Sequence, residues 1–142
     1  MKRLTIAILS IAIALWPASQ VFAGPAFIEA NVPEGKVIVY FYFPQALFIN
    51  FSPLVVAKDG PIGVLSAGNY RVYISDPGTL RFWLVSLNSA GIKLEVLAGQ
   101  TYYVKCGEMG STPNVRIVQL TFQLTPRDKA IADIERCTLL SD

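Results

Sequence analysis

The sequence predicts a mainly β protein, a small antiparallel β-sandwich of about eight strands with one C-terminal α-helix packed on it. Short runs rich in β-branched and aromatic residues recur at steps of eight to fourteen residues. Turn residues such as Gly, Pro and Asp separate these runs, and only the last element changes to helical periodicity. Short, regularly spaced strands with turn signals between them are typical of sandwiches and small barrels.

Residues 1–23 have the pattern of a secretion signal. Two positive charges, Lys2 and Arg3, precede an apolar stretch over 4–16, and the chain reaches small residues at Ala23. We expect cleavage near Ala23 and export to the periplasm or the cell exterior. A retained membrane anchor stays open as the alternative, although Pro17 leaves fewer uninterrupted apolar residues than the roughly 20 that a spanning helix needs.

Cleavage after Ala23 removes two of the 12 basic residues and leaves ten against ten acidic ones. A chain of zero net charge lacks the cationic surplus that binds phosphate backbones, so nucleic acid is not an expected partner. Residues 24–35 are rich in Pro and Gly and are predicted to be a linker. Residues 36–142 are predicted to form a single domain.

The first strand is expected over 36–43, KVIVYFYF, which has apolar groups on both faces. Such a strand is covered on both sides, or one of its sides is covered by something outside the domain. The later strands are expected at 54–57, 62–65, 70–75, 79–85, 92–97, 101–106 and 115–124. The turns Asp59-Gly60-Pro61, Asp76-Pro77-Gly78 and Ala98-Gly99-Gln100 place Gly where a positive φ is needed.

The last element is predicted to be a helix that packs its apolar stripe on the sandwich. Its apolar residues fall at helical spacing: Ala130, Ile131, Ile134, Cys137 and Thr138. Thr125 is the expected N-cap, with Pro126 at the first helical position and Asp128 as a capping carboxylate.

The middle of the chain resembles the bacterial exported family named domain of unknown function 2846. The shared features are a strand that ends in Pro (VIVYFYFP), a D-G hairpin, a G-x-Y strand, a P-G turn and the run LAGQTYYV, within about 37–106. The hairpin and the P-G turn also resemble PEGA-type and Ig-like β-sandwich modules. The resemblance implies a small exported β-sandwich of unknown function. This chain departs from the family at Phe43 and Leu80, where members often carry a basic residue and a His.

Candidate chemistry is sparse. The chain has no histidine, so no Ser-His or Cys-His nucleophile pair can form, and no Ser-x-x-Lys, P-loop or EF-hand pattern is present. We therefore expect no enzymatic activity, no catalytic residue, no cofactor and no metal site.

The two cysteines are predicted to form a structural disulfide between Cys106 and Cys137. Cys106 shares one strand face with Val104, and Cys137 lies on the apolar stripe of the helix, so both thiols are expected to face one interior. An oxidising compartment favours such a bridge. A thiol redox role is the remote alternative.

Residues 41–53 form an uncharged, apolar segment between the first two strands. Its large side chains either close one end of the core or form a contact surface, made of Phe43, Leu47, Phe48, Ile49 and Phe51. The leading hypothesis is an exported, non-catalytic module that binds an envelope protein partner through 41–53, or supports an envelope assembly. The alternative is a periplasmic carrier of an apolar small molecule, and membrane association stays open but is not required.

Overall fold

The apolar run predicted as the first strand forms the centre of the molecule. The computed structural model describes residues 27–44, 52–85, 91–109 and 119–140. Within it β1 (Val37–Phe43) is buried along its whole length and has a neighbouring strand on each side. The domain itself covers both faces of β1, which is the first of the two predicted possibilities.

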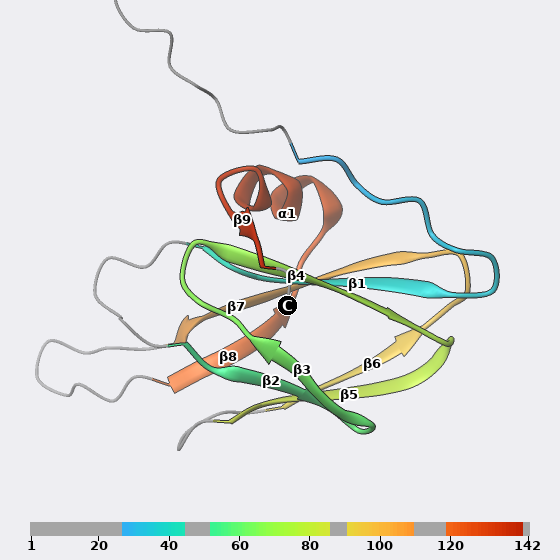
Figure 1. Ribbon diagram of the computed structural model, residues 1–142, viewed down its shortest axis with the longest axis horizontal. Coiled ribbons are helices and arrows are strands. Elements are labelled where there is room, and N and C mark those ends of the chain that lie inside the picture. The colour runs from blue at the N-terminus through green and yellow to red at the C-terminus, as the bar shows by residue number, and fades with distance from the viewer. Residues whose placement is uncertain (1–26, 45–51, 86–90, 110–118, 141–142) are drawn as a thin grey trace, which may run out of the picture.

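The described residues form nine strands in two sheets, in agreement with the predicted fold class. Sheet A has the strand order β8-β7-β1-β4-β9, and sheet B has the order β3-β2-β5-β6 (Figure 1). After β1 the elements are β2 (Leu54–Ala57), β3 (Gly60–Val64), β4 (Asn69–Ser75), β5 (Gly78–Val85), β6 (Ile92–Val96), β7 (Thr101–Met109), β8 (Gln119–Leu124), α1 (Arg127–Ile134) and β9 (Thr138–Leu139).

The main core lies between the two sheets. Val37, Val39, Phe41 and Phe43 point from β1 toward sheet B, where they meet side chains such as Phe82. The rings of Phe41 and Phe82 pack edge to face with 4.7 Å between centroids. Burial alternates along β6, where Leu94 and Val96 are buried in this core while Lys93 and Glu95 are exposed.

A second layer covers the other face of sheet A. Helix α1 and the segment 27–35, which we call the strap, both lie on the side of sheet A opposite sheet B (Figure 1). Ala130 and Ile134 of α1 are buried against the outward-facing residues of β1, among them Tyr40. The prediction that the helix packs on the sandwich is therefore confirmed, and it packs on the outer surface of sheet A.

The structure corrects three details. Sheet A is mixed, because β1 pairs in parallel with β7; the whole of sheet B lies between them in sequence and provides the long crossover that a parallel pair needs. The strap packs against the sheet, where a linker was expected. The helix N-cap is Pro126 without a side-chain cap bond, because the Thr125 hydroxyl donates to the Gln123 carbonyl instead.

Candidate functional site

The predicted contact surface lies only partly within the described residues. Phe43 is 1% exposed and belongs to the core between the sheets, so its assignment to a surface is wrong. The reason is strand alternation: Phe43 follows Val39 and Phe41 on the inward row of β1. Leu47, Phe48, Ile49 and Phe51 lie outside the described residues.

The predicted Cys106–Cys137 disulfide is not formed in the structure, where both cysteines are free. Cys106 faces the core between the two sheets, together with Val104. Cys137 follows α1 on the other side of sheet A, where its thiol lies close to the carbonyl of Asp133. The prediction was wrong because it assumed that both thiols face the same interior. Sheet A instead separates two interiors, and each contains one of the cysteines.

Burial suppresses ionisation of both thiols. It raises the pKa of Cys106 to about 12, and together with the nearby Asp133 carboxylate it raises the pKa of Cys137 to about 11. A thiolate is the reactive form of cysteine, so neither residue has the environment of a redox-active thiol at neutral pH.

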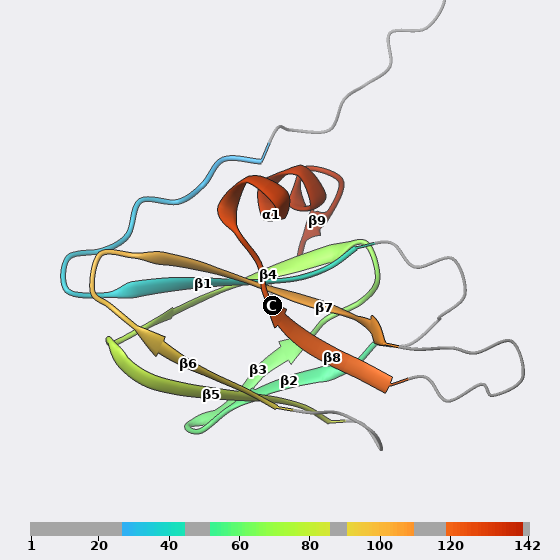
Figure 2. The same cartoon turned by 180° about the vertical axis from the view of Figure 1, so that it is seen from behind.

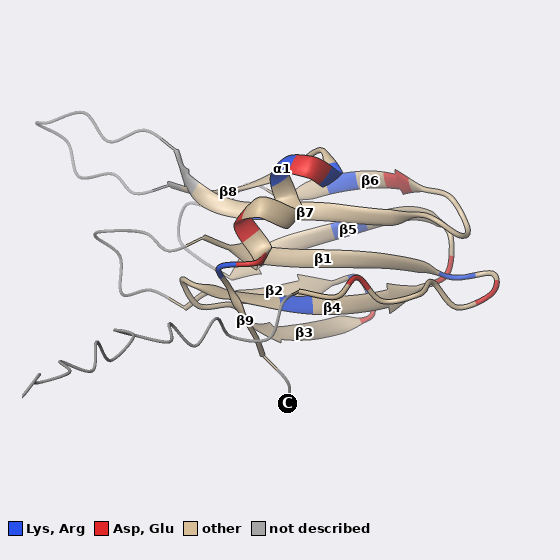
Figure 3. Cartoon of the chain, turned by 90° about the horizontal axis from the view of Figure 1, so that it is seen from above, with Lys and Arg blue, Asp and Glu red and all other residues tan. Residues whose placement is uncertain are grey.

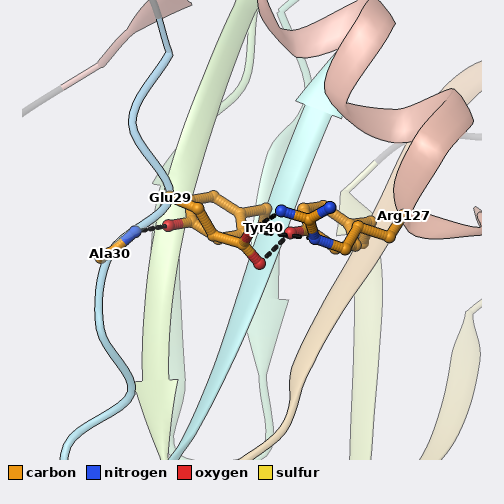
Figure 4. Close-up of polar contacts among 5 residues, drawn as sticks. Glu29, Ala30, Tyr40 and Arg127 are labelled. Atoms are coloured by element: carbon orange, nitrogen blue, oxygen red, sulfur yellow. Dashed lines mark hydrogen bonds and ion pairs between the residues drawn. The ribbon is translucent and has the colours of Figure 1, made fainter.

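The strap is fixed to sheet A and α1 by the carboxylate of Glu29. Tyr103 of β7 donates its hydroxyl hydrogen to Glu29 Oε1, and Arg127 of α1 donates from Nε and Nη2 to Oε2 at 3.0 and 2.7 Å. Beside them, the Ala30 N–H donates to the Tyr40 hydroxyl at 2.8 Å (Figure 4). One side chain therefore joins three elements that are far apart in sequence.

Electrostatics favour the ionised form of Glu29. Partial burial works to raise the pKa of Glu29, but hydrogen bonds from Arg127 and Tyr103 outweigh it and leave the pKa lowered. Burial and the neighbouring Glu29 carboxylate raise the pKa of Tyr103, which keeps its hydroxyl protonated as a donor. The lowered pKa of Glu29 and the raised pKa of Tyr103 keep both groups in the protonation states that form this contact. Neither group is therefore free to act as a base or an acid toward solvent.

The outward surface of sheet B carries exposed apolar side chains. Val64, Trp83 and Val85 are 41%, 41% and 59% exposed. The strand registers place Leu54 between Val64 and Val85, and Val56 beside Trp83, on the same surface. We call these five residues the sheet B patch: Leu54, Val56, Val64, Trp83 and Val85.

Two cations lie next to the sheet B patch. Arg81 and Lys93 are direct cross-strand neighbours, and with Trp83, Gly91 and Ile92 they line a small open hollow of about 230 Å³. The indole of Trp83 lies over Gly91, where an added Cβ would come within 2.9 Å of indole Cδ1. The absence of a side chain at Gly91 thus leaves room for the indole, and the two cationic residues line the same hollow.

The outer side of sheet A offers two shallow open grooves beside the connection from β8 to α1. One, of about 310 Å³, is lined mainly by Thr101–Tyr103 and Leu124–Arg127. The other, of about 470 Å³, includes Lys105, Lys129 and Asp133, and Lys105 and Asp133 pair with each other at 3.5 Å. Neither groove encloses a buried polar group that would orient a ligand.

Two further features are absent from the described part of the chain, a metal site and a membrane-spanning helix. There, no group of three or more His, Cys, Asp or Glu side chains is placed to hold a metal ion. The described residues include no helix with the length and apolar character needed to cross a membrane.

Sequence reasoning missed both the strap contact and the sheet B patch. The signal for the patch lies in the strand GTLRFWLV, where Trp83 and Val85 alternate with the buried Phe82 and Leu84. Because successive side chains of a strand point to opposite faces, the burial of Phe82 and Leu84 in the core places Trp83 and Val85 on the outward face. For Glu29 no local pattern was available, because its partners are 74 and 98 residues away.

Comparisons with protein-family models, curated proteins and solved structures find no match to the chain. The resemblance to the domain of unknown function 2846 family stays a prediction.

Proposed function

We propose that the chain is an exported, non-catalytic module that binds a protein partner through the sheet B patch. The observation that carries the proposal is the exposure of Trp83, Val64 and Val85 on one sheet surface that no described element covers. Clustered exposed apolar side chains mark interaction sites, and Trp is among the residues that contribute most to binding at interfaces.

The charges beside the patch favour a partner segment that carries carboxylates next to apolar side chains. Arg81 and Lys93 both lie on the patch side of sheet B, and Arg81 is exposed. Lys93 forms a long ion pair with Glu95 at 3.6 Å, so its ammonium group can also pair with a carboxylate of a partner. A basic pair beside a tryptophan therefore complements an acidic, apolar surface.

The non-catalytic part of the proposal rests on chemistry. The sequence has no histidine. The best-connected carboxylate, Glu29, is engaged by Arg127 and Tyr103, and the two thiols have raised pKa values. These groups have roles in packing and fastening, which gives a thiol redox function little support.

The carrier alternative also has less support than the binding module. A carrier would hold cargo between sheet A and α1, but tyrosine rings occupy that space. Tyr40 and Tyr103 are stacked with 5.5 Å between centroids, and Phe27 of the strap packs on Tyr40 at 5.3 Å. Cargo would have to displace this packing.

The proposal is tested by photo-crosslinking in the native host. A photoreactive amino acid at position Val85 is expected to capture one partner, and one at Thr79, at the far end of the same outward row, is expected to capture none. The adduct at Val85 should disappear when Arg81→Glu is added, because a carboxylate there would repel the acidic partner. Circular dichroism on each variant confirms that the domain is folded.

Two outcomes contradict the proposal. One is the absence of any adduct specific to Val85. The other is an adduct that persists unchanged in both Arg81→Glu and Trp83→Ser.

Of the predicted contact segment 41–53, the residues Leu47, Phe48, Ile49 and Phe51 stay a prediction, because they lie outside the described residues. Substitution of Phe48 and Phe51 by Ser should then abolish the adduct at Val85 and leave the melting temperature nearly unchanged. A fall of many degrees in melting temperature would instead assign these side chains to the core.

A further inference from the structure

The four edge strands of the sandwich differ in how well they are protected against pairing with another chain. The edge strands are β3 and β6 of sheet B, and β8 and β9 of sheet A. Natural edges are protected by charged residues, prolines, irregularities or shortness. β3 contains Pro61 beside a register shift, β6 carries Lys93 and Glu95, and β9 is only two residues long.

β8 has none of these protections. Its sequence, QLTFQL, contains no charge and no proline over six residues. Figure 3 shows β8 without a charged residue, while β6 carries both signs. Seen from behind in Figure 2, β8 runs along the border of sheet A and then leads into α1.

The ladder between β7 and β8 fixes which backbone groups of β8 face outward. The Thr125 N–H donates to the Tyr103 carbonyl at 2.9 Å, so these two residues form a hydrogen-bonded antiparallel pair. Alternation along the ladder then directs the N–H and C=O groups of Leu120, Phe122 and Leu124 away from β7. Among the described residues, these groups have no strand partner.

The side chains of β8 are self-complementary. The stretch from Leu120 to Leu124 reads L-T-F-Q-L. Apolar and polar residues alternate in it, and the order is the same from either end. If two copies align antiparallel about Phe122, Leu120 lies opposite Leu124 of the other copy and Thr121 lies opposite Gln123. The apolar residues all fall on the inward face, where Leu120 and Phe122 already contact the core.

The backbone groups match in the same register. The three pairs across the two-fold axis are Leu120 with Leu124, Phe122 with Phe122, and Leu124 with Leu120, and all three use outward-directed groups. Each such pair can exchange two hydrogen bonds. Leu124, which is 49% exposed, would be covered by the second copy.

We infer that β8 is a homodimerisation edge, which joins two copies of this chain through antiparallel β8–β8 pairing into one continuous sheet with two-fold symmetry. This edge is separate from the sheet B patch and leaves that patch on each copy exposed.

The test uses two matched double variants that differ only at position 121. Gln123→Glu is common to both, so the effect of the new carboxylate on Lys105, its cross-strand neighbour, and on Asp133 in the same groove is shared by the two variants. With Thr121→Glu, the pairing would set carboxylate against carboxylate twice. With Thr121→Lys, the same pairing would set ammonium against carboxylate twice.

The masses are measured by light scattering after size-exclusion chromatography of the protein purified from its host, at concentrations from about 1 to 200 µM. We expect twice the chain mass for the original protein and for Thr121→Lys/Gln123→Glu, and the single-chain mass for Thr121→Glu/Gln123→Glu. The two double variants should have equal circular dichroism spectra and similar melting temperatures. This control shows that charge, and not unfolding, separates the copies.

Three results would overturn the inference. One is a single-chain mass of the original protein at the highest concentration. Another is an equal mass for the two double variants. The third is a complex that contains one copy and a different polypeptide.

Discussion

The two faces of sheet A are packed by different means. The inward row of β1 is Val37, Val39, Phe41 and Phe43, and its surroundings are aliphatic and phenyl side chains of sheet B. The outward row contains Tyr40 and Tyr42, and it is covered by the strap and α1. The inner core is held by apolar contact, whereas the outer layer combines ring packing with hydrogen bonds such as those of Glu29.

This difference suggests that the layers separate in stages. The inner core is built from two sheets that bury large side chains completely. The strap and α1 bury few residues each, and their polar fastening at Glu29 depends on charge. Elements with few buried contacts open at lower free energy than the core on which they lie.

The largest effect is expected from the inner face. Phe41→Ala removes a fully buried ring that packs against both Phe82 and Phe122. We expect a loss of about 3–5 kcal/mol in the free energy of unfolding, measured by urea denaturation. Val72→Ala, at a position 37% exposed on β4, is the control and should cost far less.

A smaller effect is expected from the outer layer. Ile134→Ala removes a fully buried side chain from the contact between α1 and sheet A. We expect a loss of about 2–4 kcal/mol by the same measure, together with faster proteolysis after α1. If protection of the inner strands against hydrogen exchange falls as much as protection of α1, the two layers are one cooperative unit.

The hydrogen bond from Tyr103 to Glu29 should contribute less to the free energy of unfolding than the side chain of Ile134 does. Tyr103→Phe keeps the ring stacked on Tyr40 but leaves Glu29 without one hydrogen bond. A hydrogen bond to a charged group contributes about 1.5–3 kcal/mol. The matched control is Leu80→Val, a small apolar change at a partly buried position near the inner core; its melting temperature should stay above that of Tyr103→Phe.

The smallest effect is the pH dependence of the Glu29 contact. Because the folded-state pKa of Glu29 is lowered, its stabilisation is complete above the unfolded pKa of about 4.3 and is lost as the pH falls through the folded value. Glu29→Gln should therefore lower the melting temperature at pH 6 and make little difference near pH 2. An equal difference at both pH values would show that the carboxylate charge has no role.

The sequence predicted which residues form the strands and the helix better than it predicted which elements pack together. Strand 54–57 has the predicted bounds, and the double burial of β1 follows from its uninterrupted apolar run. The layer on which α1 packs could not be derived, because an amphipathic stripe such as Ala130 and Ile134 fits either face of a sheet. The error over Cys106 and Cys137 has the same origin: strand and helix periodicity give a direction relative to one element, not to the whole fold.

The two cysteines report separately on the two layers, so their alkylation tests the account most directly. Iodoacetamide is pulsed at pH 8 on protein isolated without reductant, across a urea series, and labelling is read by mass spectrometry. Because burial raises both thiol pKa values, each cysteine should react only when its own layer opens. We predict that Cys137 is labelled at a lower urea concentration than Cys106, and that Cys106 is labelled only as the β-sheet circular dichroism signal is lost. Protection of both thiols even in the unfolded protein, which would reveal a disulfide, or labelling of both at one midpoint, would contradict the separation of the molecule into two cores.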